Sequence, residues 1–88
     1  MSFFGMIVEE VEQLAAQMTQ RAEEITQLMG HLTSQLESTS WVGPDRENFH
    51  GEWHSSHIPA LQNVANALGQ AASKAHMNAQ QQREASAT

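Results

Sequence analysis

The sequence predicts an all-α protein in which one antiparallel helix-turn-helix hairpin pairs with another to form a four-helix bundle. Two long amphipathic segments and a turn between them support this prediction. The chain has 88 residues, enough for one domain but only a thin core in a two-helix fold. We expect a single hairpin over residues 1–88, with a first helix at about 4–39, a bend at 40–44, a second helix at about 45–80 and a polar tail at 81–88.

The first segment repeats apolar residues at alternating three- and four-residue steps, the period of an amphipathic helix. This seam consists of Phe4, Ile7, Val11, Leu14, Met18, Ile25, Leu28 and Leu32, with Arg21 as its one break. Beside it, and widening it, lie Val8, Ala15, Ala22, Met29 and Leu36. Three apolar positions per heptad suit a helix that touches two neighbours. Because a lone hairpin would leave such a face uncovered, we expect a second hairpin to cover it.

The middle of the chain carries turn chemistry and then a second amphipathic segment. In Trp41-Val42-Gly43, the glycine can adopt backbone angles closed to other residues, and Pro44 suits a first helical turn. The following apolar stripe consists of Phe49, Trp53, Leu61, Val64, Leu68, Ala71, Ala72 and Ala75. Pro59 lies inside this second helix and should kink it or split it near Ser55.

Composition excludes several functional classes. Ten acidic residues against four basic ones give a net charge of −6, which disfavours nucleic acid as a partner. The chain has no cysteine, so it forms neither a disulfide framework nor a cysteine-based zinc site. Its longest run of bulky apolar residues is far too short to span a membrane. No basic region with a cleavage site follows Met1, so export by a Sec-type signal peptide is not expected.

Three histidines form the main chemical cluster in the sequence. His50, His54 and His57 stand at i, i+4 and i+7, which places them on one helical face with Glu52 nearby. Two histidines four apart can share a metal ion, but no third and fourth ligand is evident, so we expect no metal or other cofactor. A pH-sensitive interface and a plain structural role both remain open. In the first case, repulsion and burial would loosen the assembly as the pH falls from about 6.5 to about 5.

The remaining residues suggest no catalytic machinery. The sequence has no recognisable nucleophile with a base, no phosphate-binding loop and no paired carboxylates, so we do not expect an enzyme. Trp41, at the bend between two helices, should cap the end of a narrow bundle and bury a large area.

The central Trp41-Val42-Gly43 bend, two roughly equal helical arms and the short chain together resemble the WXG family, the small helical hairpins related to the early secreted antigenic target of mycobacteria. Phe49 and Trp53, one and two turns beyond the bend, are similar to the large apolar residues that members place there. The resemblance implies a homodimer or heterodimer with another WXG-type hairpin and secretion by a type VII (ESX-type) system. It also implies that Trp41 and Gly43 form the bend or recognition motif, with Trp41 as half of a recognition surface near the partner's tail. This interpretation of Trp41 is compatible with its capping of the bundle.

One family feature is absent. The export signal of the family is a Tyr-x-x-x-Asp/Glu motif after the second helix, whereas this chain contains no tyrosine. Gln80 and Glu84 have the right spacing, but glutamine lacks the aromatic ring. The resemblance therefore implies that a partner carries the signal, that export follows another route, or that the chain is not exported.

Two alternative functions compete with the secretion hypothesis. One is a membrane-active, pore-forming assembly that uses the apolar segment from Phe3 to Val8 and the histidine face. The acidic surface and the lack of a basic face for anionic lipids make a membrane partner less favoured. The other is a cytosolic adaptor that binds an effector and has no role in export.

Overall fold

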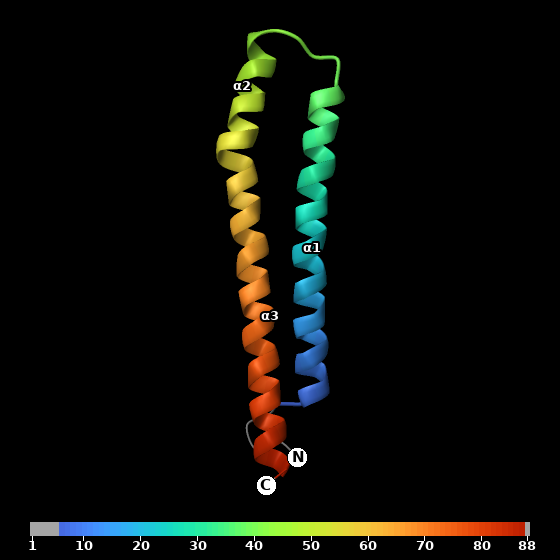
Figure 1. The fold of residues 1–88 in the computed structure, drawn as a ribbon, viewed down its shortest axis with the longest axis vertical. Coiled ribbons are helices and arrows are strands. Elements are labelled where there is room, and N and C mark those ends of the chain that lie inside the picture. The colour runs from blue at the N-terminus through green and yellow to red at the C-terminus, as the bar shows by residue number, and fades with distance from the viewer. Residues whose placement is uncertain (1–5, 88) are drawn as a thin grey trace.

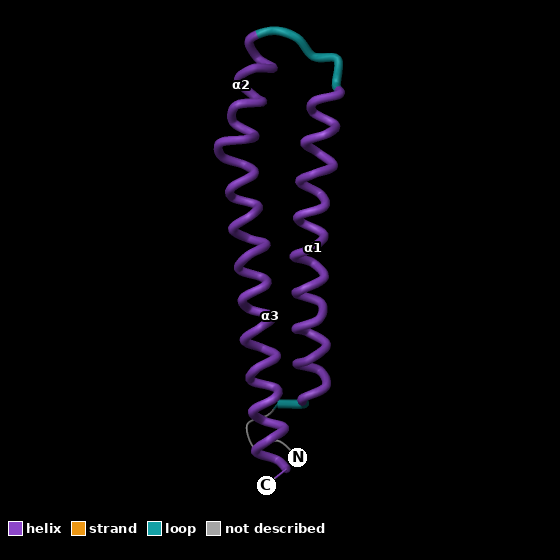
Figure 2. The backbone as a smooth tube through the Cα atoms, in the orientation of Figure 1, coloured by secondary structure: helices purple, strands orange, loops and turns teal. Residues whose placement is uncertain are grey.

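The computed structural model of the chain describes residues 6–87 as a long helical hairpin (Figure 1). One arm is α1 (Val8–Ser38); the other runs without interruption through α2 (Pro44–Glu52), the π-helical turn η1 (Trp53–His57) and α3 (Ile58–Ala87). The two arms lie side by side and antiparallel, and the described residues contain no strand (Figure 2). The predicted all-α class and the packing of two helices against each other are confirmed.

The first helix ends where hydroxyl side chains donate hydrogen bonds to one of its last backbone carbonyls. The hydroxyl groups of Ser38 and Thr39 donate hydrogen bonds to the carbonyl of Gln35, at 3.2 and 2.6 Å. Thr39 itself has an extended backbone, with φ −74° and ψ 135°. Local hydroxyl bonds of this kind compete with helix propagation, so α1 stops here and the connecting segment begins.

The bend depends on the conformation of one glycine. Gly43 has φ 123° and ψ −179°, a region that is essentially restricted to glycine. The next residue, Pro44, opens α2 at a position where a missing N–H costs nothing. Asp45 and Glu47 lie in the first turn of α2, where the helix dipole favours negative charge.

Pro59 is accommodated by a wider helical turn rather than by a break. The backbone N–H of Ile58 donates to the carbonyl of Trp53, five residues back, and η1 lies immediately before the proline. A proline ring inside an α-helix presses on the carbonyl four residues earlier, here that of Ser55. The π turn makes room for this ring, and the second arm continues to its end.

The polar end of the chain is helical where a tail at 81–88 was expected, since α3 extends to Ala87. One cross-arm contact supports this difference. Ala79 is 0% exposed, and the Arg83 guanidinium donates two hydrogen bonds to the Glu12 carboxylate, at 2.9 and 3.2 Å. The contact with Glu12 ties this part of α3 to α1 although its own sequence has no apolar period.

The core is thin and consists mostly of small side chains. Among the described residues, the buried apolar ones are Ala15, Met29, Ala72 and Ala79. The molecule measures 66 × 17 × 15 Å, with a radius of gyration of 19.5 Å. A compact domain of this length would have a radius of gyration of about 12 Å. Two helices in contact leave most of each helix surface open, so the hairpin alone cannot enclose its larger apolar residues.

Candidate functional site

The predicted apolar seam divides into two faces, one turned into the hairpin and one turned outward. Half-buried between the arms are Val11, Met18, Ile25, Trp53, Leu61 and Leu68. The exposed members are Ile7, Leu14, Leu28, Leu32, Phe49 and Val64. Phe4 lies outside the described residues. The fully buried positions of α1, Ala15 and Met29, come from the set expected only to widen the seam.

Three exposed residues at the start of α1 and along it form a regular line, which we call the outer stripe and define as Ile7, the N-cap, with Leu14 and Leu28. Their exposed fractions are 59%, 51% and 50%. They are spaced in multiples of seven residues, so they share one helix face, and Arg21 occupies the missing position. Large aliphatic side chains half open to solvent along one face are typical of a surface that another helix covers.

At the bend, aromatic rings surround an apolar groove. The ring centroids of Trp41 and Phe49 lie 5.4 Å apart, and the Trp53 indole N–H donates to the Thr33 hydroxyl at 2.9 Å. A groove of about 400 Å³ lies between the arms. It is lined by Leu32, Gln35, Leu36, Thr39, Trp41, Phe49 and Trp53. Trp41 is 38% exposed and Val42 is 96% exposed, so the bend presents apolar surface to solvent.

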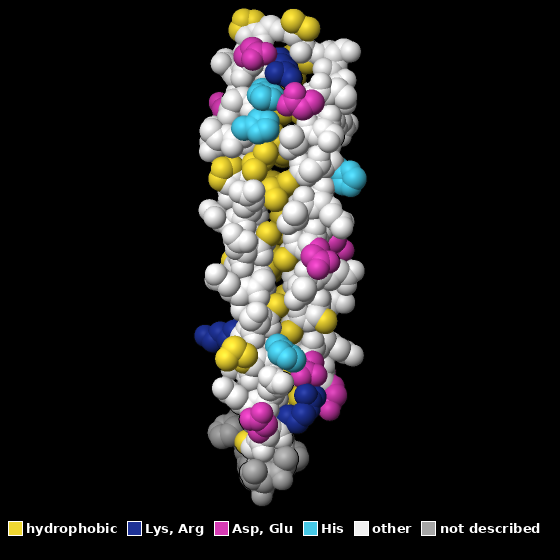
Figure 3. Space-filling model, in the orientation of Figure 1, with side chains coloured by type: hydrophobic (Ala, Val, Ile, Leu, Met, Phe, Trp, Pro, Cys, Tyr) yellow, Lys and Arg dark blue, Asp and Glu magenta, His cyan; other side chains and the backbone are white. Residues whose placement is uncertain are grey.

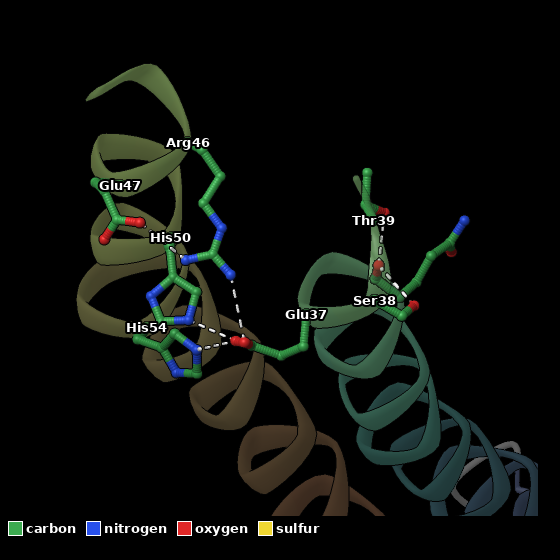
Figure 4. Close-up of polar contacts among 8 residues, drawn as sticks. Glu37, Ser38, Thr39, Arg46, Glu47, His50 and His54 are labelled. Atoms are coloured by element: carbon green, nitrogen blue, oxygen red, sulfur yellow. Dashed lines mark hydrogen bonds and ion pairs between the residues drawn. The ribbon is translucent and has the colours of Figure 1, made fainter. Parts of the chain in front are cut away.

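Beside the aromatic groove, a polar cluster joins the two arms (Figure 4). Glu37, near the end of α1, faces Arg46 and His50 of α2 and His54 of η1. One carboxylate oxygen, Oε1, lies 2.5 Å from His50 Nε2 and 3.8 Å from His54 Nε2. The other, Oε2, lies 3.4 Å from Arg46 Nη2. The hydrogen bond from His50, aided by the positive charge of Arg46, lowers the pKa of the Glu37 carboxyl.

The three predicted histidines do not form one group. His50 and His54 have ring centroids 4.5 Å apart, whereas the His57 ring lies 6.0 Å from that of Trp53. His54 and His57 are exposed and His50 is half-buried, and His50 and His54 face the Glu37 carboxylate of the other arm. The premise of a dry helix–helix contact, which underlay the expected loosening below about pH 6.5, is therefore not met within the hairpin.

A second polar contact joins the arms at the opposite end. Glu12 pairs with Arg83 and lies 3.7 Å from His76 Nδ1. The hydrogen bond from Arg83 lowers the pKa of the Glu12 carboxyl, and the same bond raises the pKa of Arg83. Figure 3 shows clusters of charged and histidine side chains at both ends of this face, further acidic side chains near its middle, and apolar side chains along the groove between the arms.

Sequence reasoning did not identify Glu37, Thr33, Glu12 or Arg83 as partners in cross-arm contacts. Helical periodicity reports contacts within one arm and says nothing of which residues face each other across the hairpin. The bend supplies part of this signal, because residues about equally far before and after Gly43 face each other, as Thr33 and Trp53 do. Glu12 and Arg83 lie at unequal distances from Gly43, so their contact does not follow from this rule.

No described helix is both long enough and apolar enough to cross a membrane. Comparisons with protein-family models, with curated proteins and with solved structures find no match to this chain. A functional proposal therefore depends on the geometry of the hairpin and on the residues of its bend.

Proposed function

We propose that this chain is a non-enzymatic, WXG-type helical hairpin that pairs with a second hairpin and serves as a substrate or export partner of a type VII secretion system. The outer stripe is the observation on which this proposal mainly rests. Among the described residues, the hairpin buries only Ala15, Met29, Ala72 and Ala79 well, yet it leaves large aliphatic residues half exposed along one face, so it has much to gain from a partner.

Pairing of two hairpins would complete a four-helix bundle. In such a bundle each helix touches two neighbours, which matches the two apolar faces of α1. One face packs on α3, and the outer stripe remains for the partner. The partner is a second copy or a related hairpin, and a related hairpin with a tail tyrosine would supply the export motif that this chain lacks.

The bend supports the same assignment. Gly43 has the glycine-only backbone, Pro44 begins the second arm, and Trp41 stacks near Phe49 while remaining partly exposed. An indole that is anchored on one side and open on the other can contribute both to stability and to a contact with a partner. Both interpretations of Trp41 therefore apply to one side chain.

Substitution of the outer stripe tests the pairing. Leu14→Asp with Leu28→Asp should dissociate the assembly while leaving the helix content of the hairpin largely intact, because both side chains are already about half exposed in the single hairpin. Gln13→Asp with Gln27→Asp changes the net charge equally on exposed positions and is the matched control. Sedimentation velocity at micromolar concentration gives the mass, and circular dichroism gives the helix content. A wild-type chain that sediments as a folded monomer, alone and with candidate partner hairpins, would overturn the proposal.

Export is tested separately from pairing. In a host with an active type VII system and a tyrosine-bearing partner hairpin, the chain should accumulate in the culture supernatant. Trp41→Ala should reduce this accumulation without reducing the cellular amount. Pairing without export would favour the adaptor alternative, and leakage of acidic-lipid vesicles at neutral or acidic pH would favour the membrane alternative.

A further inference from the structure

The polar cluster at the bend contains three metal-binding side chains from two arms. Glu37 comes from α1, His50 from α2 and His54 from η1. Each offers one ligand atom, and the three atoms all lie within 4.8 Å of one another. We infer that Glu37, His50 and His54 form a zinc-binding site that cross-links the two arms beside the bend. This inference does not depend on the proposed function.

The distances between the ligand atoms fit a tetrahedral site. Zinc–nitrogen and zinc–oxygen bonds of about 2.0–2.2 Å place neighbouring ligand atoms of a tetrahedron about 3.3 Å apart. From Glu37 Oε1, the two imidazole Nε2 atoms lie at 2.5 and 3.8 Å, on either side of that value. The remaining separation, between the two histidine ligand atoms, is no more than 4.8 Å, so we expect side-chain rotations to bring the three atoms to coordinating positions.

The chemistry of the ligands selects the class of ion. Two imidazoles and one carboxylate suit zinc, whereas magnesium and calcium require mostly oxygen ligands. Three protein ligands leave a fourth position open, and the side chains are 31–49% exposed, so water and the ion both have access. Figure 4 shows both imidazole rings directed at the same carboxylate group.

Arg46 affects the site in two opposing ways. It holds Glu37 Oε2 at 3.4 Å, which orients the carboxylate and leaves Oε1 to the histidines. Its positive charge also repels a cation, although Glu47, 3.3 Å from Arg46 Nη1, compensates part of that charge. A partly neutralised guanidinium permits binding but keeps it weaker than binding to the three ligands alone would be.

The position of the site gives the ion a structural effect. Glu37 lies on one arm and both histidines on the other, so an ion bound by all three ties the end of α1 to the beginning of the second arm. An ion that binds only the folded hairpin stabilises it. The aromatic groove lies beside the site, so a bound ion would also hold Phe49 and Trp53 in place.

Calorimetric titration with zinc chloride tests the assignment. The wild-type chain should bind one zinc ion per chain, and its melting temperature should rise with zinc. His50→Gln, His54→Gln and Glu37→Gln should each weaken binding at least about tenfold, because even residues that only support a metal ligand contribute that much. His57→Gln is the matched control, since His57 is in the same segment but faces Trp53, and it should bind like the wild type. Arg46→Gln should bind more tightly.

Imidazole NMR spectra show which nitrogens the ion contacts. Zinc should shift the Nε2 signals of His50 and His54 and leave those of His57 unchanged, and magnesium should shift none. Circular dichroism checks that each variant keeps its helices, as expected for changes at exposed or half-buried side chains. Equal binding by wild type and His54→Gln, loss of binding in His57→Gln, or one zinc ion per two chains would each overturn the inference.

Discussion

The two ends of the hairpin hold their helices together by different means. Near the termini, alanines meet closely, with Ala72 and Ala79 almost fully buried and Ala15 on the facing arm. Near the bend, the contact relies on rings and polar side chains, including Trp53 bonded to Thr33 and His50 bonded to Glu37. Small side chains let helices approach closely and leave little uncovered, whereas large ones remain partly outside a two-helix contact.

This difference means that the grooves at the two ends are lined by different kinds of side chain. The groove of about 400 Å³ at the bend is bordered by exposed Leu32, Trp41 and Phe49, and the candidate zinc ligands lie beside it. A groove near the termini is lined by Ala15, Ala72 and polar neighbours and offers no large apolar side chain. The groove at the bend therefore combines aromatic and aliphatic side chains beside metal-binding ones, whereas the groove between Ala15 and Ala72 is lined by small and polar residues.

Replacement of the two tryptophans should show this contrast most strongly. Trp53→Ala should lower the free energy of unfolding by about 3 kcal/mol, because it removes both a half-buried ring and the hydrogen bond to Thr33. Trp41→Ala should cost about 1–2 kcal/mol, because its ring is 38% exposed. Urea unfolding followed by circular dichroism at one fixed protein concentration measures both. An equal or larger loss for Trp41 would show that its ring is the main anchor of the bend.

Overpacking the alanine end should come next in size. Ala79→Leu adds volume at a position with no exposed surface and should destabilise the hairpin by about 2 kcal/mol. Ala67→Leu, on the exposed side of α3, is the matched control and should change stability by less than about 0.5 kcal/mol. The same unfolding experiment serves for both. A tolerated Ala79→Leu would mean that the arms can separate at this end without loss.

Two glycine substitutions should have opposite signs. Gly43→Ala should cost about 1–2 kcal/mol, and the whole penalty comes from backbone strain, because an added Cβ would meet nothing within 4 Å. Gly30→Ala, inside α1 and equally unobstructed, should stabilise the protein by about 0.5–1 kcal/mol through helix propensity. Thermal melting of both variants checks the signs. If Gly43→Ala were neutral, the bend could adopt another conformation at no cost.

Helical periodicity predicted the all-α class and the packing of two helices, because alternating three- and four-residue steps admit no strand. It could not decide which apolar residues face the other arm. Leu14 and Ala15 are adjacent in sequence and both fit a broad stripe, yet Ala15 is buried and Leu14 is half exposed. An apolar seam three residues wide covers a broad arc of the helix surface, so it leaves the rotation of the helix about its axis uncertain. The contact between the arms determines that rotation.

The polar cross-links were harder to predict for a related reason. Glu37 and Glu12 look like ordinary residues of an acidic face until the register of the hairpin places a cation opposite each. The helical end of the chain also depends on a contact with the other arm, since Arg83 bonds to Glu12 although its own segment has no apolar period. The local sequence predicts the helix of each arm, whereas the contacts between the arms depend on the sequences of both arms and on how the two helices are aligned.

The smallest expected effect is the response of the two ends to acid. The Glu37 and Glu12 carboxyls have pKa values lowered from 4.5 by their hydrogen bonds to His50 and Arg83, so the unfolded chain takes up protons before the folded one. The stabilisation from each pair is present above about pH 4.5 and is lost as the pH falls through the folded-state pKa. Both carboxylates are exposed to solvent, so the loss should be small and should shrink further in high salt. Glu37→Gln and Glu12→Gln should each flatten the decline in melting temperature below about pH 4.5, and Glu10→Gln, on the exposed side of α1, is the matched control. A decline as steep in both variants as in the wild type would mean that neither cross-arm pair contributes to stability in solution.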